Sequence, residues 1–181
     1  WPRVDVRVRT GESREIARMV REREVDCGFV TSKVDVAGLA LRPLYREEIV
    51  LVVAADSGWG TRVELADVPL IAFPERAGFR RFLERAFAAA GLSPQVKMEI
   101  DSVEATKGLV AAGLGGAFLP APAVQHELGS QQLQRLRIQR LPRLHRQTYL
   151  VQREDQRPSA ALRHFLTLLA AKSGSPEDHS R

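Results

Sequence analysis

Cysteine is almost absent from this chain of 181 residues, and its scarcity excludes two structural classes. The single cysteine, Cys27, can form no disulfide within the chain and offers no thiolate cluster for zinc. Because Cys27 lies inside an apolar run, we expect a buried, inert thiol and not a nucleophile. The sequence thus argues against a disulfide scaffold and a zinc module.

Long hydrophobic runs are missing as well. No apolar stretch approaches the ~18 residues that a membrane helix needs, and no signal-peptide pattern opens the chain. Hydrophobic residues make up 44% of the chain and aromatic residues only 6%, which is typical of a soluble α/β protein. We therefore expect no membrane partner, and a targeting segment ahead of Trp1 stays an open alternative.

The residue sets that carry catalysis are also lacking. The chain has no Gly-x-Ser-x-Gly elbow for a serine nucleophile. The glycine-rich run 113–116 follows a helical pattern and precedes a strand, which reverses the order of a dinucleotide-binding loop. No metal-ligand spacing links the four histidines, His126, His145, His164 and His179. We expect no enzyme activity, no metal and no cofactor.

Charge is the one compositional excess, with a formal net charge of +5 and a pI near 10.0. Basic residues are spread along the chain among acids, and the densest group is Arg135, Arg137, Arg140, Arg143 and Arg146. No aromatic residue lies among these arginines to stack on bases. We interpret the group as a solvated basic face and not as a nucleic-acid site.

Helical and strand patterns alternate along the chain. The predicted helices are 12–23, 80–90, 103–112, 124–128 and one opened by Pro158. The predicted strands are 4–8, 25–30, 49–54, 70–73, 96–100, 117–119 and 149–151. This alternation predicts an α/β fold with mostly parallel sheets and helices on both faces.

The most informative segment runs from Asp101 to Pro120. We expect Asp101 to cap the helix, with Glu104 as the acid of a capping box, and Gly113 to end the helix in a left-handed conformation. The free N–H groups of Ser102 and Val103, with that of Glu104, would then face the space before the helix. Such donors can hold a carboxylate or phosphate; the alternative is an ordinary capped helix.

Two hydroxyl residues follow another buried strand pattern. Thr31 and Ser32 come directly after the strand 25–30, so their hydroxyls would lie at its carboxyl end and could donate to a bound ligand. The equal alternative is a turn in which both hydroxyls bond the local backbone.

The segment 101–120 closely resembles the effector-binding domain of LysR-type transcriptional regulators. The resemblance rests on the acid–Ser step, the run Leu-Val-Ala-Ala-Gly-Leu-Gly and the Phe-Leu-Pro that ends it. Four further motifs follow the family order: Trp1-Pro before a strand, Val25 to Val30, Leu41 to Val53, and Pro69 to Pro74. The likeness extends from Trp1 to about Ala171.

This resemblance implies two Rossmann-like subdomains joined by two crossover strands, as in type 2 periplasmic binding proteins. Subdomain I would comprise residues 1–56 and 143–172, subdomain II residues 57–142, and 173–181 a disordered tail. A small anionic effector would bind in the cleft between the lobes. The loop 73–79 is the matching ligand-contact loop, so Arg76 and Phe79 join the candidates; a salt-bridged Arg76 is the alternative.

The resemblance also implies what the intact protein does. A LysR-type regulator is a homo-oligomer, dimer or tetramer, and binds DNA through an N-terminal winged helix-turn-helix. That domain and the family's first strand–helix unit would precede Trp1, so this chain is not expected to read DNA sequence, and unpaired strand edges favour self-association. The alternatives are a solute-binding protein of a transport system and a two-lobed enzyme.

Overall fold

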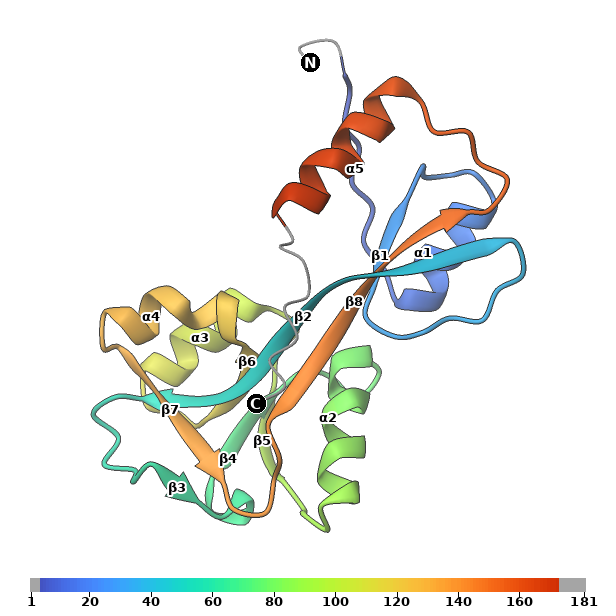
Figure 1. Cartoon of the computed structure of the whole chain (residues 1–181). Helices are drawn as coiled ribbons and strands as arrows, with labels where there is room; N and C mark the ends of the chain where they lie inside the picture. The colour runs from blue at the N-terminus through green and yellow to red at the C-terminus, as the bar shows by residue number, and fades with distance from the viewer. Residues whose placement is uncertain (1–3, 173–181) are drawn as a thin grey trace, which may run out of the picture. The chain divides into compact units, whose positions relative to one another are not determined.

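The structure is a computed structural model that describes residues 4–172 of the chain (Figure 1). The chain separates into two compact units. Unit 1 comprises the described residues up to Arg46 together with those from Arg146 onward, and unit 2 comprises Glu47–His145. The predicted tail 173–181 and the Trp1-Pro step lie outside the described residues.

Unit 1 is built on the helix α1 (Ser13–Arg21), whose apolar face was predicted correctly. Ile16, Met19 and Val20 are buried on that face and pack against Val30 and Val151. Val30 ends the short strand β1 (Gly28–Val30), which pairs antiparallel with the strand β8 (Leu144–Arg153). The helix α5 (Ala160–Lys172) completes the unit.

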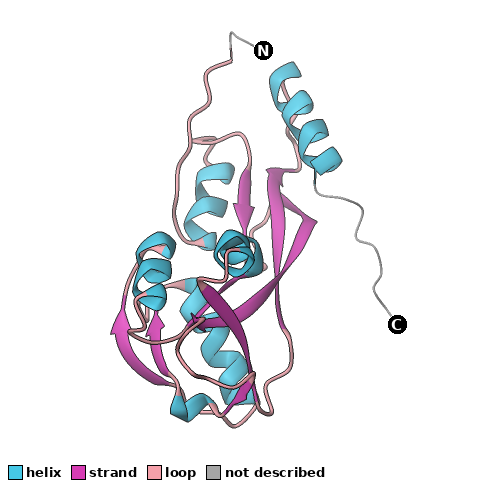
Figure 2. Ribbon diagram, turned by 90° about the vertical axis from the view of Figure 1, so that its left-hand side faces the viewer, coloured by secondary structure: helices cyan, strands magenta, loops and turns pink. Residues whose placement is uncertain are grey.

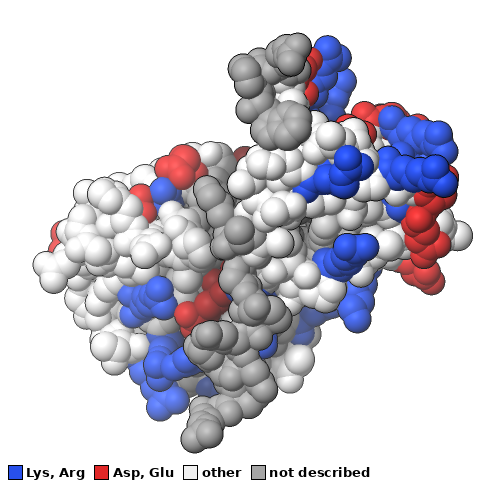
Figure 3. All heavy atoms as spheres, turned by 45° about the horizontal axis from the view of Figure 1, so that its top comes forward, with Lys and Arg blue, Asp and Glu red and all other residues white. Residues whose placement is uncertain are grey.

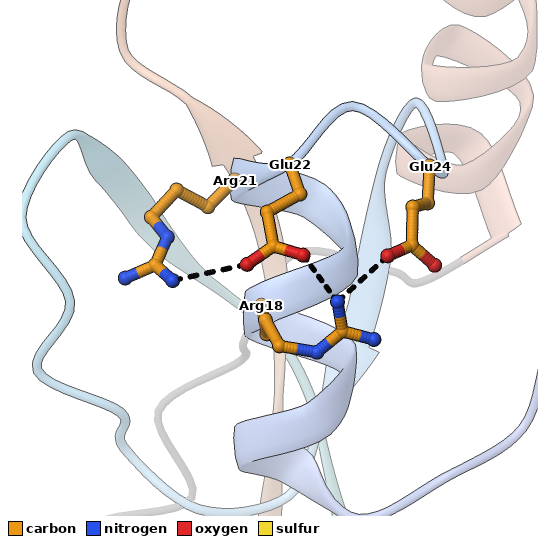
Figure 4. A network of polar contacts seen from close by, with 4 residues as sticks. All are labelled: Arg18, Arg21, Glu22 and Glu24. Carbon is orange, nitrogen blue, oxygen red and sulfur yellow. Dashed lines mark hydrogen bonds and ion pairs between the residues drawn. The ribbon is translucent and has the colours of Figure 1, made fainter.

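The last turn of α1 carries a surface network of charges (Figure 4). The guanidinium of Arg18 donates to Glu22 and to Glu24, the latter at 2.7 Å, and Arg21 donates to Glu22 at 3.2 Å. The hydrogen bond from Arg21 is the main cause that lowers the pKa of Glu22. All four side chains are more than two-fifths exposed, so the network contributes little to stability.

The strand predicted over 4–8 is not formed, and Figure 2 shows a loop ahead of α1. Val4, Val6 and Val8 are 40%, 75% and 81% exposed. The alternation of valines with polar residues is typical of a strand, but a strand needs a neighbouring strand for its backbone hydrogen bonds. No such neighbour pairs with this segment in the described part of the chain.

Two long strands run through both units. The strand β2 (Leu39–Ala54) and β8 cross from one unit to the other at positions 46–47 and 145–146. The run 49–54 of β2 is fully buried, as its continuous apolar pattern predicted.

Unit 2 packs helices on two faces of its strands. Its strands are β3 (Arg62–Val63), β4 (Pro69–Ala72), β5 (Gln95–Glu99), β6 (Ala117–Pro120) and β7 (Leu133–Ile138). Its helices are α2 (Gly78–Ala89), α3 (Val103–Ala111) and α4 (Gln125–Gly129), with short 3-10 turns at Leu65–Asp67 and Ala121–Val124. One apolar core forms under α2 around Leu51, Leu83 and Phe87. The other forms under α3 and α4 around Val52 and Val110.

The expectation of mostly parallel sheets is wrong. Strand β2 pairs antiparallel with both β6 and β7, and β1 pairs antiparallel with β8. Within residues 4–172, parallel pairing is found between β3 and β7, between β4 and β5, and at the single bridge of Leu70 with Gly116. The alternation of helices and strands predicts a layered α/β fold, but it does not fix strand direction. Here β6 and β7 run opposite to the long strand β2, with which both pair.

Two glycines let β6 approach β4 closely. A Cβ atom on Gly115 would lie 2.4 Å from the carbonyl oxygen of Pro69, and one on Gly116 would lie 2.8 Å from Val68. The amide of Gly116 donates to that carbonyl at 2.9 Å, and its own carbonyl accepts from Ile71 at 2.8 Å. Gly113 has φ of 75°, which confirms the predicted left-handed end of α3. Each glycine of this turn therefore has a separate steric role.

Candidate functional site

Four of the six predicted site residues come from segments that follow the neighbouring strands β4 and β5. These strands are parallel, with Ala72 in register with Glu99, and the amide of Ile100 donates to the carbonyl of Ala72 at 2.9 Å. Carboxyl ends of parallel strands share one sheet edge. Arg76 and Phe79 therefore follow one strand, and Ser102 and Val103 follow the other, at the same edge of unit 2.

Ser102, and not Asp101, is the N-cap of α3. Ser102 has an extended backbone (φ −156°, ψ 122°), and its Oγ accepts a hydrogen bond from the amide of Ala105 at 3.2 Å. Its carbonyl accepts from the hydroxyl of the buried Thr106 at 2.8 Å. The predicted capping box is wrong, because Glu104 stands one position too early to be its acid.

Two backbone donors of α3 remain open at this edge. The first N–H groups of a helix have no acceptor within the helix, and Ser102 satisfies the one on Ala105. Those of Val103 and Glu104 have no hydrogen-bond partner in the described part of the chain. The Ser102 hydroxyl keeps its own proton to donate, so three donors meet at the positive end of the helix.

A lysine clamp holds α3 to α4 behind these donors. Lys107 Nζ lies 2.8 Å from Glu127 and 2.9 Å from Glu104. The hydrogen bond to Glu127, followed by that to Glu104, raises the pKa of Lys107. The hydrogen bond from Lys107 lowers the pKa of Glu127. One lysine thus pairs with two carboxylates, so the negative charge of Glu104 near the helix end is compensated only in part.

The loop between β4 and α2 presents Arg76 to solvent. Arg76 is exposed, and its guanidinium has no partner within the described residues, while its carbonyl accepts from Arg81. The predicted alternative, an arginine held in a salt bridge, is thus not formed among these residues. Phe79 packs against Phe73 with ring centroids 5.3 Å apart and against Phe82 at 6.3 Å. Arg76 is available to a ligand, whereas Phe79 is engaged in packing.

Arg80 holds this loop in place, and it was not among the predicted site residues. Its side chain is only 9% exposed. It donates to Glu84 at 2.7 Å, to the Phe73 carbonyl at 3.1 Å and to Glu99 at 3.3 Å. The signal was in the sequence, since positions 80, 83 and 87 share one helical face and the other two are apolar.

Thr31 and Ser32 belong to unit 1 and follow β1, as predicted. Both are exposed, and the amide of Thr31 donates to the Ser13 hydroxyl at 3.4 Å. That bond connects the end of β1 to the first turn of α1. The two side-chain hydroxyls have no partner within residues 4–172, so they stay predicted ligand contacts.

Residues 4–172 offer little for thiol chemistry, metal binding or an enclosed ligand cavity. Burial raises the pKa of the Cys27 thiol, which disfavours a thiolate. Residues 4–172 hold no group of three or more side chains suited to a metal ion and no helix that could span a membrane. An apolar cavity lined by Phe73, Phe87 and Phe118 has a volume of about 10 Å³, which is room for one water molecule and not for a metabolite.

Comparison with known proteins identifies one family over nearly the whole chain. The model of the LysR substrate binding domain matches residues 1–174. A probable nitrogen assimilation transcriptional activator of Synechococcus elongatus is 28% identical over 176 residues, covering 93% of this chain and 57% of that protein. The HTH-type transcriptional regulator YusT of Bacillus subtilis is 30% identical, covering 91% of this chain and 55% of its own length. The chain thus spans about half the length of the curated relatives it matches.

Solved structures agree on the fold. The regulatory domain of CcmR from Synechocystis, in complex with 2-PG, superposes with a TM-score of 0.80 at 21% identity, covering 97% of this chain and 86% of that one. The effector binding domain of QuiR, in complex with shikimate, gives 0.71 at 21% identity, covering 90% of this chain and 78% of that one. With a family model that matches nearly the whole chain, this protein belongs to the LysR substrate-binding domain family.

Proposed function

We propose that this chain is the effector-sensing domain of a LysR-type transcriptional regulator, and that a small anionic metabolite binds at the amino end of α3. The family match and the names of the curated relatives support regulation over solute transport. The role is regulatory and not catalytic. DNA binding, oligomerisation and a cytoplasmic location belong to the proposal for the intact regulator.

The observation that carries the ligand class is the set of open donors at α3. The amides of Val103 and Glu104 and the Ser102 hydroxyl converge where the helix dipole is positive. Arg76 supplies an unpaired guanidinium at the same sheet edge. A carboxylate or phosphate satisfies these donors, while a neutral ligand leaves the charge of Arg76 unused.

Effector binding would act by shifting the equilibrium between conformations of the sensor domain. A coupling free energy of about 1–3 kcal/mol is ordinary for such regulation. One or two charge-assisted hydrogen bonds present in only one conformation supply a difference of that size.

The test removes one backbone donor and keeps the helix. Val103 is the first helical residue, where proline is tolerated, and Ser102 before it already has the extended backbone that proline requires. Val103→Pro therefore deletes a single N–H group. Ser102→Pro is a poorer choice, because the φ of −156° at Ser102 is incompatible with the proline ring.

Binding would be measured by calorimetry with shikimate, 2-PG and a panel of simple carboxylates and phosphate esters. We expect Val103→Pro to weaken the binding of an anionic ligand by roughly tenfold or more, since a charge-assisted hydrogen bond contributes ~1.5–3 kcal/mol. Val103→Ala is the matched control, because it shortens the same side chain and keeps the N–H group. Equal affinities of the two variants, both folded by circular dichroism, would place the anion elsewhere.

A further inference from the structure

Two arginines lie side by side on the edge strand β3 and its neighbour β7 in unit 2. Strands β3 and β7 are parallel, and Arg62 is in register with Arg137. Neighbouring strands lie about 4.8 Å apart, and residues in register point to the same face of a sheet. Their successors in the chain, Val63 and Ile138, are buried on the opposite face. The two guanidinium groups therefore share the outward face.

Carboxylates do not neutralise this pair. Arg135, on the same face of β7, is paired with Glu48 at 3.2 Å, and Arg140 is paired with Glu64 at 3.5 Å. Arg62 and Arg137 have no ion-pair partner among residues 4–172. Basic side chains gather at the lower left of the view in Figure 3, the side on which Figure 1 shows β3 and β7.

Like charges in register across two strands repel one another. Two apolar or oppositely charged residues would stabilise this ladder better, so the pair has an energetic cost in the free protein. An anion between the two guanidinium groups removes the repulsion, and the planar fork of arginine matches phosphate oxygens well.

The chemistry around the pair selects among anionic partners. The large hydrophobic residues that are exposed in the described chain lie on neither β3 nor β7, so the surface lacks the buried anchor of a protein interface. No exposed aromatic ring stands on these two strands to stack on bases, which disfavours single-stranded nucleic acid. A surface that offers arginine charge, but neither an apolar anchor nor an aromatic ring, matches the phosphate backbone of duplex DNA.

The sequence pattern favoured a solvated face for Arg137, but it did not show that Arg62 lies beside it. We propose that Arg62 and Arg137 form a phosphate contact for duplex DNA, which would be weak, salt-sensitive and without sequence preference. The contact goes beyond the proposed effector site and does not require a bound metabolite. In a regulator held at its operator, even a weak contact acts at high effective concentration. It would bias the position of the sensor domain against neighbouring DNA.

The experiment titrates the chain against a fluorescent duplex of about 30 base pairs and random sequence, by anisotropy at several salt concentrations between ~20 and 150 mM. No metabolite is added, so the result is independent of the effector proposal. We expect binding that weakens steeply with salt. The double substitution R62Q/R137Q should reduce the slope of log affinity against log salt by about 2, because each of the two arginines neutralises one phosphate.

The matched control removes the same charge elsewhere. Arg42 on β2 and Arg85 on α2 are exposed and form no ion pair within residues 4–172, so R42Q/R85Q lowers the net charge equally. The proposal holds if only R62Q/R137Q changes the slope. It is overturned if both double variants lose equal affinity, if the wild type does not bind at ~20 mM salt, or if polyglutamate competes as well as duplex DNA.

Discussion

Replacing Arg80 by methionine should destabilise unit 2, and the structure sets the size of the effect. The arginine comes from α2 and ties three segments together: its own helix through Glu84, the end of β5 through Glu99, and the loop after β4 through the Phe73 carbonyl. Methionine keeps most of the aliphatic packing of the arginine stem, so Arg80→Met removes mainly the charge and its hydrogen bonds.

The magnitude follows from the exposure of the partners. Breaking a fully buried ion pair costs ~3–5 kcal/mol, because the remaining charge stays buried. Glu84 and Glu99 are 43% and 44% exposed, so both carboxylates regain water and the cost is smaller. The Phe73 carbonyl loses a charge-assisted donor at 3.1 Å, worth ~1.5–3 kcal/mol before rehydration. We expect a loss of about 2 kcal/mol.

Urea denaturation followed by circular dichroism measures this loss, and thermal melting should show a decrease of roughly 4–8 °C. Arg85→Met is the control, because Arg85 lies on the exposed face of the same helix and should change stability by less than ~0.5 kcal/mol. If the two variants are equally stable, the three hydrogen bonds of Arg80 contribute nothing to stability and the reasoning is refuted.

Three further outcomes are expected. Glu127→Gln should destabilise the protein at neutral pH. Because the hydrogen bond from Lys107 lowers the pKa of Glu127, the advantage of the wild type should be lost as the pH falls through that lowered pKa, and a series of urea midpoints from pH 7 downward would show it. Gly115→Ala should cost roughly 2 kcal/mol or more, since its Cβ would lie 2.4 Å from a backbone oxygen of β4, whereas Gly108→Ala, in open space on α3, should raise the melting temperature. The chain should self-associate at micromolar concentration. Because Val6 is 75% exposed, Val6→Lys should place a charge in the apolar contact between copies and reduce the apparent mass in light scattering. A monomeric wild type would contradict this.

The sequence was sufficient for several features that depend on neighbours in the chain. The buried face of α1, with Ile16, Met19 and Val20, follows from helical periodicity. The left-handed Gly113 follows from the steric freedom of glycine at a helix end. The family resemblance came from the same kind of local pattern, and the match over residues 1–174 confirms it.

The candidate site was predictable only in part. The segment around Ser102 and Val103 was identified as a helix start, but the cap was assigned one residue early, because Asp101 and Ser102 are equally good caps in sequence. The extended backbone of Ser102 decides between them. Arg80 was missed: its place on an apolar helical face indicated burial, but its partners Phe73, Glu84 and Glu99 are known only from the fold.

Local chemistry in this chain therefore determines where helices lie to within a residue or two, which faces are apolar and which family the pattern belongs to. Which strands pair, and which groups surround a buried charge, were decided by tertiary structure alone. Val4 to Val8 alternates as a strand should, yet forms none, and β2 pairs antiparallel with β6 and β7 against the expected direction. The physical reason is that a strand's hydrogen bonds and a buried charge's partners come from residues far away in the sequence, so their energies exist only once the chain has folded.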